Sequence, residues 1–400
     1  RMLGAGEAAE GMGSSQACRM SSDFTIGVEE EYQLVDADTG ALRSRARDVL
    51  TADWTAEIRP ELQETTLEIG TRICDSAQEL DRELRRLRFQ VATTAAAEGL
   101  EIAAAGTHPF SRWEEQVTTS GGRYDRIVDR FRRIARDEHN FGMHVHVAVP
   151  PEQDRIALLN VVRVFIPHLI ALCASSPFYE GDDSGYSSYR MVLWRRWPNS
   201  GIPPRLASRD EYRRFVDHLI RSGAIGDERN LYWGVRPHAI YPTLEFRVTD
   251  ACPRLDDAVA VAALVRALVV AANEGVVVEP RCAGYSEAAE HAILANNEWG
   301  AMRYGLDARL VDPAADPDGI PVRDAIRRLV DRVGPVAERL GDGPALGRIE
   351  TILERGNGAD RMRRVVRAVR EHHLLVRWLV AETMLGTGID RRRAQRGAAA

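Results

Sequence analysis

The chain has 400 residues, of which 44% are hydrophobic and 28% charged, and its formal net charge at pH 7 is −6. This composition can bury a sizeable core, and the negative charge argues against a general nucleic-acid binder or a protein of anionic membranes. No segment approaches the roughly 20 uninterrupted apolar residues of a membrane-spanning helix. We therefore expect a globular, cytoplasmic protein without a nucleic-acid or membrane partner.

Lysine is absent, so all 53 basic residues are arginine. The absence excludes a Walker A loop, a protein-kinase ATP site and a pyridoxal phosphate Schiff base, because each of these depends on a lysine. If ATP binds here, arginines and metal ions must hold its phosphates. The five cysteines show no CxxC spacing, which indicates reduced structural thiols rather than a zinc knuckle or a disulfide framework.

Residues 1–22 are rich in Gly, Ala and Ser and lack the apolar run of a secretory signal, which predicts a disordered extension. Residues 23–386 show strand and helix patterns without a repeat or long linker, so we expect a single domain there. Residues 387–400 form a basic tail rich in small residues, which we expect to be flexible. Strand patterns dominate the first 250 residues and helical patterns follow, which indicates an α+β fold.

The first predicted strand, over residues 25–34, has an acidic face. Alternation places Gly27, Glu29, Glu31 and Gln33 on one side of the strand, and apolar residues on the other side with Glu30 as the exception. Further along the chain, Glu61 and Glu68 flank residues 62–67. Carboxylates that share a shielded face keep their charge only beside a cation such as Mg²⁺, so the pattern indicates a divalent-metal site. A solvated strand face is the alternative.

A capping box at Ser76 and Glu79 predicts the start of a helix that runs to about residue 99. The elements expected after it are a strand over 100–105, a strand over 141–149, a helix over 154–175 kinked at Pro167, a helix over 210–222, a strand over 240–249, a helix over 256–273, and C-terminal helices near 321–340, 347–355 and 360–385.

Two of these strands also carry polar residues on one face. His144 and His146 share a face in the strand over 141–149, an arrangement familiar from metal hydrolases, although either residue alone is commonly structural. In the strand over 240–249, alternation places Glu245, Arg247 and Thr249 together, opposite apolar residues. A structural salt bridge explains that pair equally well. Several strands of this kind are expected in a sheet that packs on helices with one face and lines a reaction cavity with the other.

Six sequence elements together resemble the type 2 glutamate-cysteine ligase family, many of whose bacterial members are called carboxylate-amine ligases. The resemblance runs from about Thr25 to Leu385, and the occurrence of all six elements in order makes it specific. They are residues 27–36 (GVEEEYQLVD), 61–71, 106–110 (GTHPF), 142–147 (GMHVHV), 236–248 (RPH followed by TLEFRV) and 297–307 (NEWGAMRYGLD).

The resemblance implies a glutamine synthetase-like catalytic domain over residues 23–386, with a curved antiparallel sheet that forms a funnel and helices packed outside it. It also implies ATP-dependent formation of an amide bond, which can be a γ-glutamyl bond, through an acyl phosphate. The implied cofactors are ATP and Mg²⁺ or Mn²⁺, the substrates are a small carboxylic acid and an amine that resemble amino acids, and the assembly is a homodimer.

Family roles transfer to individual positions of this chain. The implied metal ligands are Glu29, Glu31, Glu61, Glu68 and Glu245. The implied catalytic residues are Arg247, which would stabilise the transferred phosphoryl group, and His144, near the metal or the phosphate. The implied substrate contacts are Thr71, His108, Arg190, Arg236 and Arg303.

Two other functions compete with the ligase. A guanidino-type phosphotransferase also stabilises phosphoryl transfer with arginines, but it would stop after phosphorylation. A metal-dependent amidohydrolase built around His144 and His146 would cleave an amide with a metal-bound water and would ignore ATP.

Overall fold

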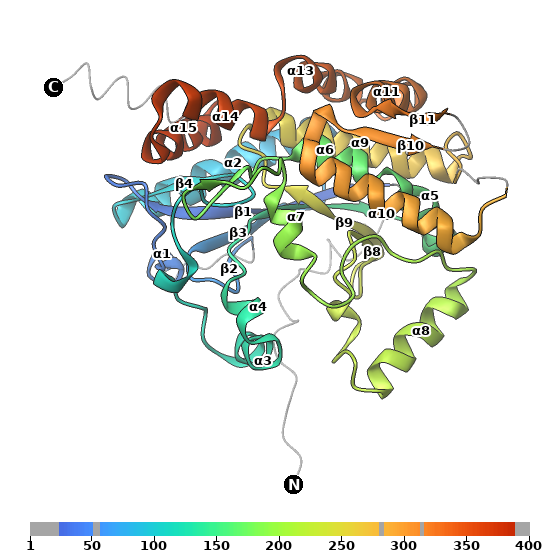
Figure 1. Ribbon diagram of the computed structural model, residues 1–400, viewed down its shortest axis with the longest axis horizontal. Helices are drawn as coiled ribbons and strands as arrows, with labels where there is room; N and C mark the ends of the chain where they lie inside the picture. Colours follow the sequence, from blue (N-terminus) through green and yellow to red (C-terminus); the bar gives the residue numbers. More distant parts are fainter. Residues whose placement is uncertain (1–23, 51–56, 280–283, 313–315, 389–400) are drawn as a thin grey trace, which may run out of the picture.

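The structure is a computed structural model that describes residues 24–50, 57–279, 284–312 and 316–388 (Figure 1). At its centre lies a seven-stranded sheet in the order β2-β3-β1-β5-β9-β8, in which β4 also pairs with β1 and every pairing is antiparallel. The strands of this sheet are β1 (Ile26–Asp36), β2 (Ile58–Pro60), β3 (Thr66–Gly70), β4 (Leu100–Ala103), β5 (Gly142–Ala148), β8 (Val235–Pro237) and β9 (Thr243–Asp250). Two small hairpins pair β6 (Phe178–Tyr179) with β7 (Asp182–Asp183) and β10 (Arg309–Asp312) with β11 (Asp316–Pro321).

Helices account for most of the remaining described residues. In the first half these are α1 (Ala46–Val49), α2 (Ala77–Ala97), α3 (Gly122–Phe131), α4 (Arg133–Arg136), α5 (Arg155–Val162), α6 (Ile166–Cys173), α7 (Tyr189–Trp194) and α8 (Arg209–Arg221). In the second half they are α9 (Leu255–Asn273), α10 (Glu287–Tyr304), α11 (Val322–Arg339), α12 (Gly343–Leu346), α13 (Arg348–Arg355), α14 (Gly358–Val369) and α15 (His372–Met384). Short 3₁₀ turns lie at η2 (Trp113–Glu115), η3 (Arg163–Phe165), η4 (Glu228–Asn230) and η5 (Gly305–Asp307).

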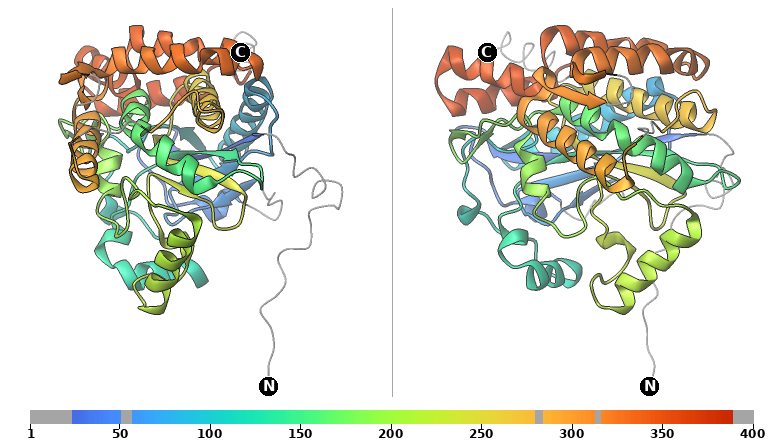
Figure 2. Two further views of the ribbon diagram at one scale, coloured as in Figure 1. Left: turned by 90° about the vertical axis from the view of Figure 1, so that its right-hand side faces the viewer. Right: turned by 45° about the vertical axis from the view of Figure 1, so that its right-hand side comes forward.

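The helices cover one face of the sheet in two layers. Helix α9, which is buried along nearly its whole length, packs against α2, α5, α6, β5 and the outer helices α11–α13. Figures 1 and 2 show the C-terminal helices as the outermost layer on this side, whereas α3, α4 and α8 lie on the other side of the sheet. The apolar side chains of the strands therefore face α2 and α9, and the polar side chains face away from these helices.

Glu30, the acidic exception on the apolar face of β1, belongs to the buried core. Its carboxylate pairs with Arg88 of α2 at 2.6 Å, and both side chains have no exposed surface. Tyr32 also donates its hydroxyl to Glu30, and Arg88 donates to the carbonyls of Cys252 and Pro253. This network joins β1, α2 and the segment that precedes α9, so Glu30 serves the fold.

We expect Arg88→Met to destabilise the protein by about 3–5 kcal/mol, because removal of one partner leaves Glu30 buried and unpaired. Arg86→Met on the same helix is the matched control, since its ion pairs with Glu57 and Glu83 are partly exposed and should contribute about 1 kcal/mol or less. Urea denaturation measures both losses. Equal losses in the two variants would contradict the structural role of Arg88.

The kink predicted at Pro167 is confirmed, because the 3₁₀ turn η3 separates α5 from α6 and the proline lies in the first turn of α6. The whole stretch Arg155–Cys173 is apolar enough to cross a membrane by length and composition, but 67% of its most apolar window is buried inside the fold. Packing in the core explains its hydropathy.

The single helix expected over 360–385 is wrong. Arg370 adopts a left-handed conformation (φ 58°, ψ 19°) and divides the segment into α14 and α15. The predicted extension over 1–22 and most of the tail over 387–400 lie outside the described residues, as do Cys18 and Cys282. Cys74, Cys173 and Cys252 are buried and free, as expected.

Candidate active site

The register of the sheet aligns polar residues from separate strands. Glu31 of β1 lies opposite Glu68 of β3, and Glu29 of β1 lies opposite His144 of β5. Farther along β5, His146 lies opposite Glu245 of β9, which in turn lies opposite Arg236 of β8. The polar face predicted for each strand thus becomes one continuous surface across the middle of the sheet.

One group of potential metal ligands consists of Glu29, His144 and Glu245, whose ligand atoms lie within 4.8 Å of one another. Nδ1 of His144 is 3.0 Å from a carboxylate oxygen of Glu29. Burial, together with the charge of Arg247, lowers the pKa of His144 to about 4, so the ring is neutral at pH 7 and one nitrogen keeps a free lone pair. Its Nε2 atom is buried without a hydrogen-bond partner.

The second group consists of Glu31, Glu61 and Glu68, whose carboxylate oxygens also lie within 4.8 Å of one another. Burial raises the pKa of Glu31 to about 7, and the neighbouring Glu61 adds to the rise while Arg190 opposes it. Burial and the charge of Glu29 raise the pKa of Glu68 well above its ordinary value. The raised pKa values show that burial and the neighbouring carboxylates disfavour the charged forms more than the surrounding arginines stabilise them.

The donor set of both groups fits divalent cations. Carboxylate oxygens are the preferred ligands of Mg²⁺ and Mn²⁺, and one neutral imidazole is compatible with either ion. A bound cation would also offset the burial and the carboxylate repulsion that raise the pKa values of Glu31 and Glu68. The buried, unpartnered Nε2 of His144 and the crowded carboxylates thus both satisfy the requirements of a metal centre.

The raised pKa of Glu31 predicts a pH-dependent stability difference. An acid with a raised pKa in the folded state destabilises the metal-free fold above pH 7, and this destabilisation disappears as the pH falls towards 4.5. In the presence of a chelator, we expect Glu31→Gln to be more stable than the wild type by about 2–3 kcal/mol at pH 8, with the difference falling below about 1 kcal/mol at pH 5. Urea denaturation at the two pH values tests this. A difference independent of pH would contradict it.

Arg247 of β9 lies beside both groups. Its guanidinium contacts Glu245 and lies 5.1 Å from the ring centre of Trp194, and 13% of the side chain is exposed. Its Nε atom has no hydrogen-bond partner. The side chain therefore places positive charge in the site and keeps one donor free for a ligand.

Thr249 does not share the polar face with Arg247, so that expectation was wrong. The register between β5 and β9 shifts between Met143 and Val145, where one residue of β5 faces two residues of β9. After this β-bulge Thr249 lies opposite Met143, is fully buried and donates its hydroxyl to the Met143 carbonyl. A bulge inserts an extra residue and so reverses the alternation beyond it.

Arg190 reaches the site from helix α7. A Cβ atom at Gly142 would lie 2.3 Å from its guanidinium, so the glycine makes room for this side chain over the end of β5. Arg190 is 1% exposed, donates to the Arg247 carbonyl and leaves its Nε without a partner.

Asp250, which the sequence patterns did not single out, accepts hydrogen bonds from the Ser175 N–H and from the hydroxyls of Ser176 and Ser188. Ser176 in turn accepts from the Arg190 backbone N–H, so Asp250 helps to place α7.

The guanidinium of Arg236 makes most of its hydrogen bonds to groups of the protein itself. It donates to the Glu245 carboxylate at 2.7 Å and to the carbonyls of Arg229 and Leu231 at 2.8 Å each. These bonds fix the orientation of Glu245. Arg59 of β2, a second residue that sequence reasoning missed, donates to Glu29 and Glu68 at 2.8 and 2.7 Å.

The remaining predicted substrate contacts lie in different surroundings. Thr71 follows β3 directly, and its hydroxyl accepts a hydrogen bond from the Val28 N–H. Both ring nitrogens of His108 are engaged within the protein, since one binds the Gly40 carbonyl and the other accepts from the Ser111 N–H. Arg303 lies over the rings of Tyr186 and Tyr304, near the hairpin β6–β7. Among the described residues, His108 and Arg303 contact none of the clustered carboxylates.

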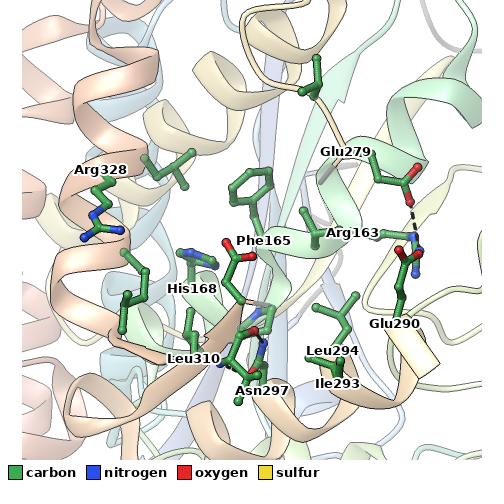
Figure 3. A pocket seen from close by; sticks show the side chains of 18 of the residues that line it. Arg163, Phe165, His168, Glu279, Glu290, Ile293, Leu294, Asn297, Leu310 and Arg328 are labelled. Carbon is green, nitrogen blue, oxygen red and sulfur yellow. Dashed lines mark hydrogen bonds and ion pairs between the residues drawn. The ribbon is translucent and has the colours of Figure 1, made fainter. Parts of the chain in front are cut away.

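A separate cavity of about 250 Å³ lies in the helical part of the molecule (Figure 3). Residues of η3, α6, α10, β10 and α11 line it, among them Phe165, His168, Leu294 and Arg328. None of the clustered carboxylates lines this cavity, so it is distinct from the candidate site.

Comparison with known proteins identifies relatives over nearly the whole chain. The family model of glutamate-cysteine ligase family 2 matches residues 25–382. A protein of Sorangium cellulosum (strain So ce56) named "Putative glutamate--cysteine ligase 2" is 38% identical over 372 residues, which cover 92% of this chain and 98% of that protein. A protein of the same name from Roseiflexus castenholzii is 38% identical over 92% of this chain and 96% of its own length.

Solved structures share the fold. A glutamate–cysteine ligase from Francisella tularensis, determined in complex with AMP, superposes with a TM-score of 0.67 at 13% identity and covers 90% of this chain and 89% of its own. A bifunctional glutathione synthetase from Pasteurella multocida gives a TM-score of 0.64 at 16% identity over 92% of this chain and 53% of that chain. The mixed helix and sheet architecture is therefore common to these proteins.

Proposed function

Since the chain belongs to glutamate-cysteine ligase family 2 and is an ATP-dependent ligase that forms amide bonds, we propose that it joins an amino-acid-like carboxylic acid to an amine through an acyl phosphate, with Mg²⁺ or Mn²⁺ as cofactor. A carboxylate does not react with an amine at neutral pH because its oxygen is a poor leaving group. Phosphorylation of that oxygen by ATP solves this problem. A glutamate donor and a γ-glutamyl product are part of the proposal.

The observation that carries the proposal is the pair of carboxylate groups beside buried arginines. Two groups of three potential ligands each share one face of the sheet, and Arg247 lies next to Glu245 of the first group. Phosphoryl transfer depends on concentrated positive charge around the transferring group. This chain has no lysine, so arginines and metal ions are its means of supplying that charge.

Bound divalent cations would polarise the phosphate oxygens and offset their negative charge. Glu29, His144 and Glu245 would hold one ion, and Glu31, Glu61 and Glu68 another. Arg247 would donate its free Nε–H to the transferring phosphoryl group, with His144 beside it. Arg190 would bind a carboxylate of the acid substrate, since its unpartnered Nε also lies in the site. Thr71 and Arg303 would make more peripheral substrate contacts.

Some broader features also belong to this proposal. The sheet would form a glutamine synthetase-like funnel with the site on its concave face, and residues 23–386 would constitute one catalytic domain. We further propose a cytoplasmic homodimer that binds neither nucleic acid nor membranes.

Reaction stoichiometry tests the proposed function. With glutamate as the acid and a panel of amino acids as amines, ADP, inorganic phosphate and amide should appear in equal amounts and only when acid, amine and Mg²⁺ are all present. A phosphotransferase would give ADP and a stable phosphorylated product without inorganic phosphate, and an amidohydrolase would consume no ATP. Family membership supports neither of these alternatives.

A further inference from the structure

Arg59 connects the two groups of potential metal ligands. Its Nη2 atom lies 2.8 Å from Glu29, a member of the first group, and its Nε atom lies 2.7 Å from Glu68, a member of the second. The residue lies on β2, a three-residue strand at the edge of the sheet. A single side chain from the edge thus contacts a carboxylate of each group.

The sheet geometry gives Arg59 its reach. Arg59 lies opposite Glu68 on β3, and Gly70, two residues further along β3, lies opposite Glu29 on β1. A Cβ atom at Gly70 would lie 4.0 Å from the Arg59 guanidinium. The guanidinium therefore passes over Gly70, which has no side chain, on its way to Glu29. The arginine therefore crosses β3 and reaches the next strand.

Arg59 and divalent cations compete for the same carboxylates. Its guanidinium uses oxygens of Glu29 and Glu68 that a divalent cation would also need, and two cations at this spacing repel each other. The side chain is 46% exposed, so it can leave towards solvent without crossing the core. Glu29 and Glu68 are much less exposed, at 22% and 9% of their side chains, and remain in place.

We propose that Arg59 is the counter-ion of Glu29 and Glu68 in the metal-free protein and that divalent cations displace it when they bind. Metal loading and release of Arg59 are then a single coupled event. The free guanidinium stays at the rim of the site, next to the ligands it has left. This inference rests on the metal centre of the proposed function but concerns a residue outside its ligand set.

Arg59→Gln tests the proposal in the absence of substrates. Removal of a unit charge about 5 Å from a divalent ion should tighten Mn²⁺ binding by about tenfold, even with the screening of bulk water. Titration calorimetry or the electron paramagnetic resonance signal of free Mn²⁺ measures this affinity. In the metal-free state the variant should have a lower melting temperature, because Glu29 and Glu68 lose their counter-ion, and Mn²⁺ should raise its melting temperature more than that of the wild type.

Two further variants make the result specific. Arg43→Gln is the matched control, since Arg43 is 44% exposed and pairs with Asp36, which belongs to neither group. Arg59→Lys keeps the charge but cannot span both carboxylates. Its Mn²⁺ affinity should therefore lie between that of the wild type and that of Arg59→Gln. An Arg59→Gln variant that is folded and binds Mn²⁺ as weakly as the wild type, or more weakly, would overturn the proposal. Failure of the wild type itself to bind Mn²⁺ would instead refute the metal centre.

Discussion

Glu68→Gln is expected to lower kcat by about 10² or more while the protein remains folded, a loss of the size seen when one key electrostatic contact of a transition state is removed. Glu68 belongs to the second ligand group, lies opposite Glu31 and has a carboxylate oxygen within 4.8 Å of one of Glu61. The amide cannot supply the negative charge that a divalent cation requires. It also removes a buried carboxylate whose pKa is raised chiefly by that burial, so the metal-free fold should not suffer.

The measurement is steady-state release of ADP over a range of Mg²⁺ concentrations, with circular dichroism to verify folding. Glu64→Gln is the matched control, because Glu64 lies on the same segment, is buried to a similar degree and pairs with Arg47 rather than with the ligand groups. Its kcat should stay close to that of the wild type. Full activity of Glu68→Gln, or activity of the wild type after exhaustive chelation, would contradict the metal centre.

Arg247→Lys is expected to reduce kcat by about 10² or more with little change in melting temperature. Lysine keeps the positive charge beside Glu245 but loses the planar set of donors that can bind phosphate oxygens. If Arg247 were only the structural partner of Glu245, the opposite result would follow: a large fall in melting temperature with nearly normal turnover. Kinetics and thermal unfolding of the same preparation separate the two roles.

Arg254→Lys serves as the control for this substitution. Arg254 is partly buried and pairs with Glu382 near the C-terminal helices, away from both ligand groups. It should lose some stability and no turnover. Comparable losses of kcat in the two variants would show that general damage to the fold, and not phosphoryl chemistry, explains the effect at Arg247.

Alternation along single strands predicted much of this site. It placed Glu29 with Glu31, and His144 with His146, on the polar faces where the structure has them. Alternation is a local property of extended backbone and can be read within a few residues. The prediction failed at Thr249, because a β-bulge depends on the pairing of two strands and leaves no signal within one of them.

Alternation along single strands could not predict contacts between segments that are far apart in the chain. The roles of Glu30 and Arg59 depend on Arg88 in α2 and on an edge strand that sequence patterns did not predict. His108 was assigned from family resemblance, yet its ring nitrogens are used by the Gly40 carbonyl and the Ser111 N–H. Pairing register and tertiary hydrogen bonds join residues far apart in sequence, which single-segment periodicity does not report.

Transfer of oxygen from the acid substrate to phosphate is the most direct test of the acyl-phosphate ligase. Glutamate with an ¹⁸O-labelled side-chain carboxylate is supplied with ATP, Mg²⁺ and an amine that supports ADP release, and mass spectrometry analyses the products. An acyl phosphate loses its bridging oxygen to phosphate when the amine attacks, so each released phosphate should carry one labelled oxygen and each amide should retain the other. Unlabelled phosphate accompanying confirmed amide formation would contradict the mechanism.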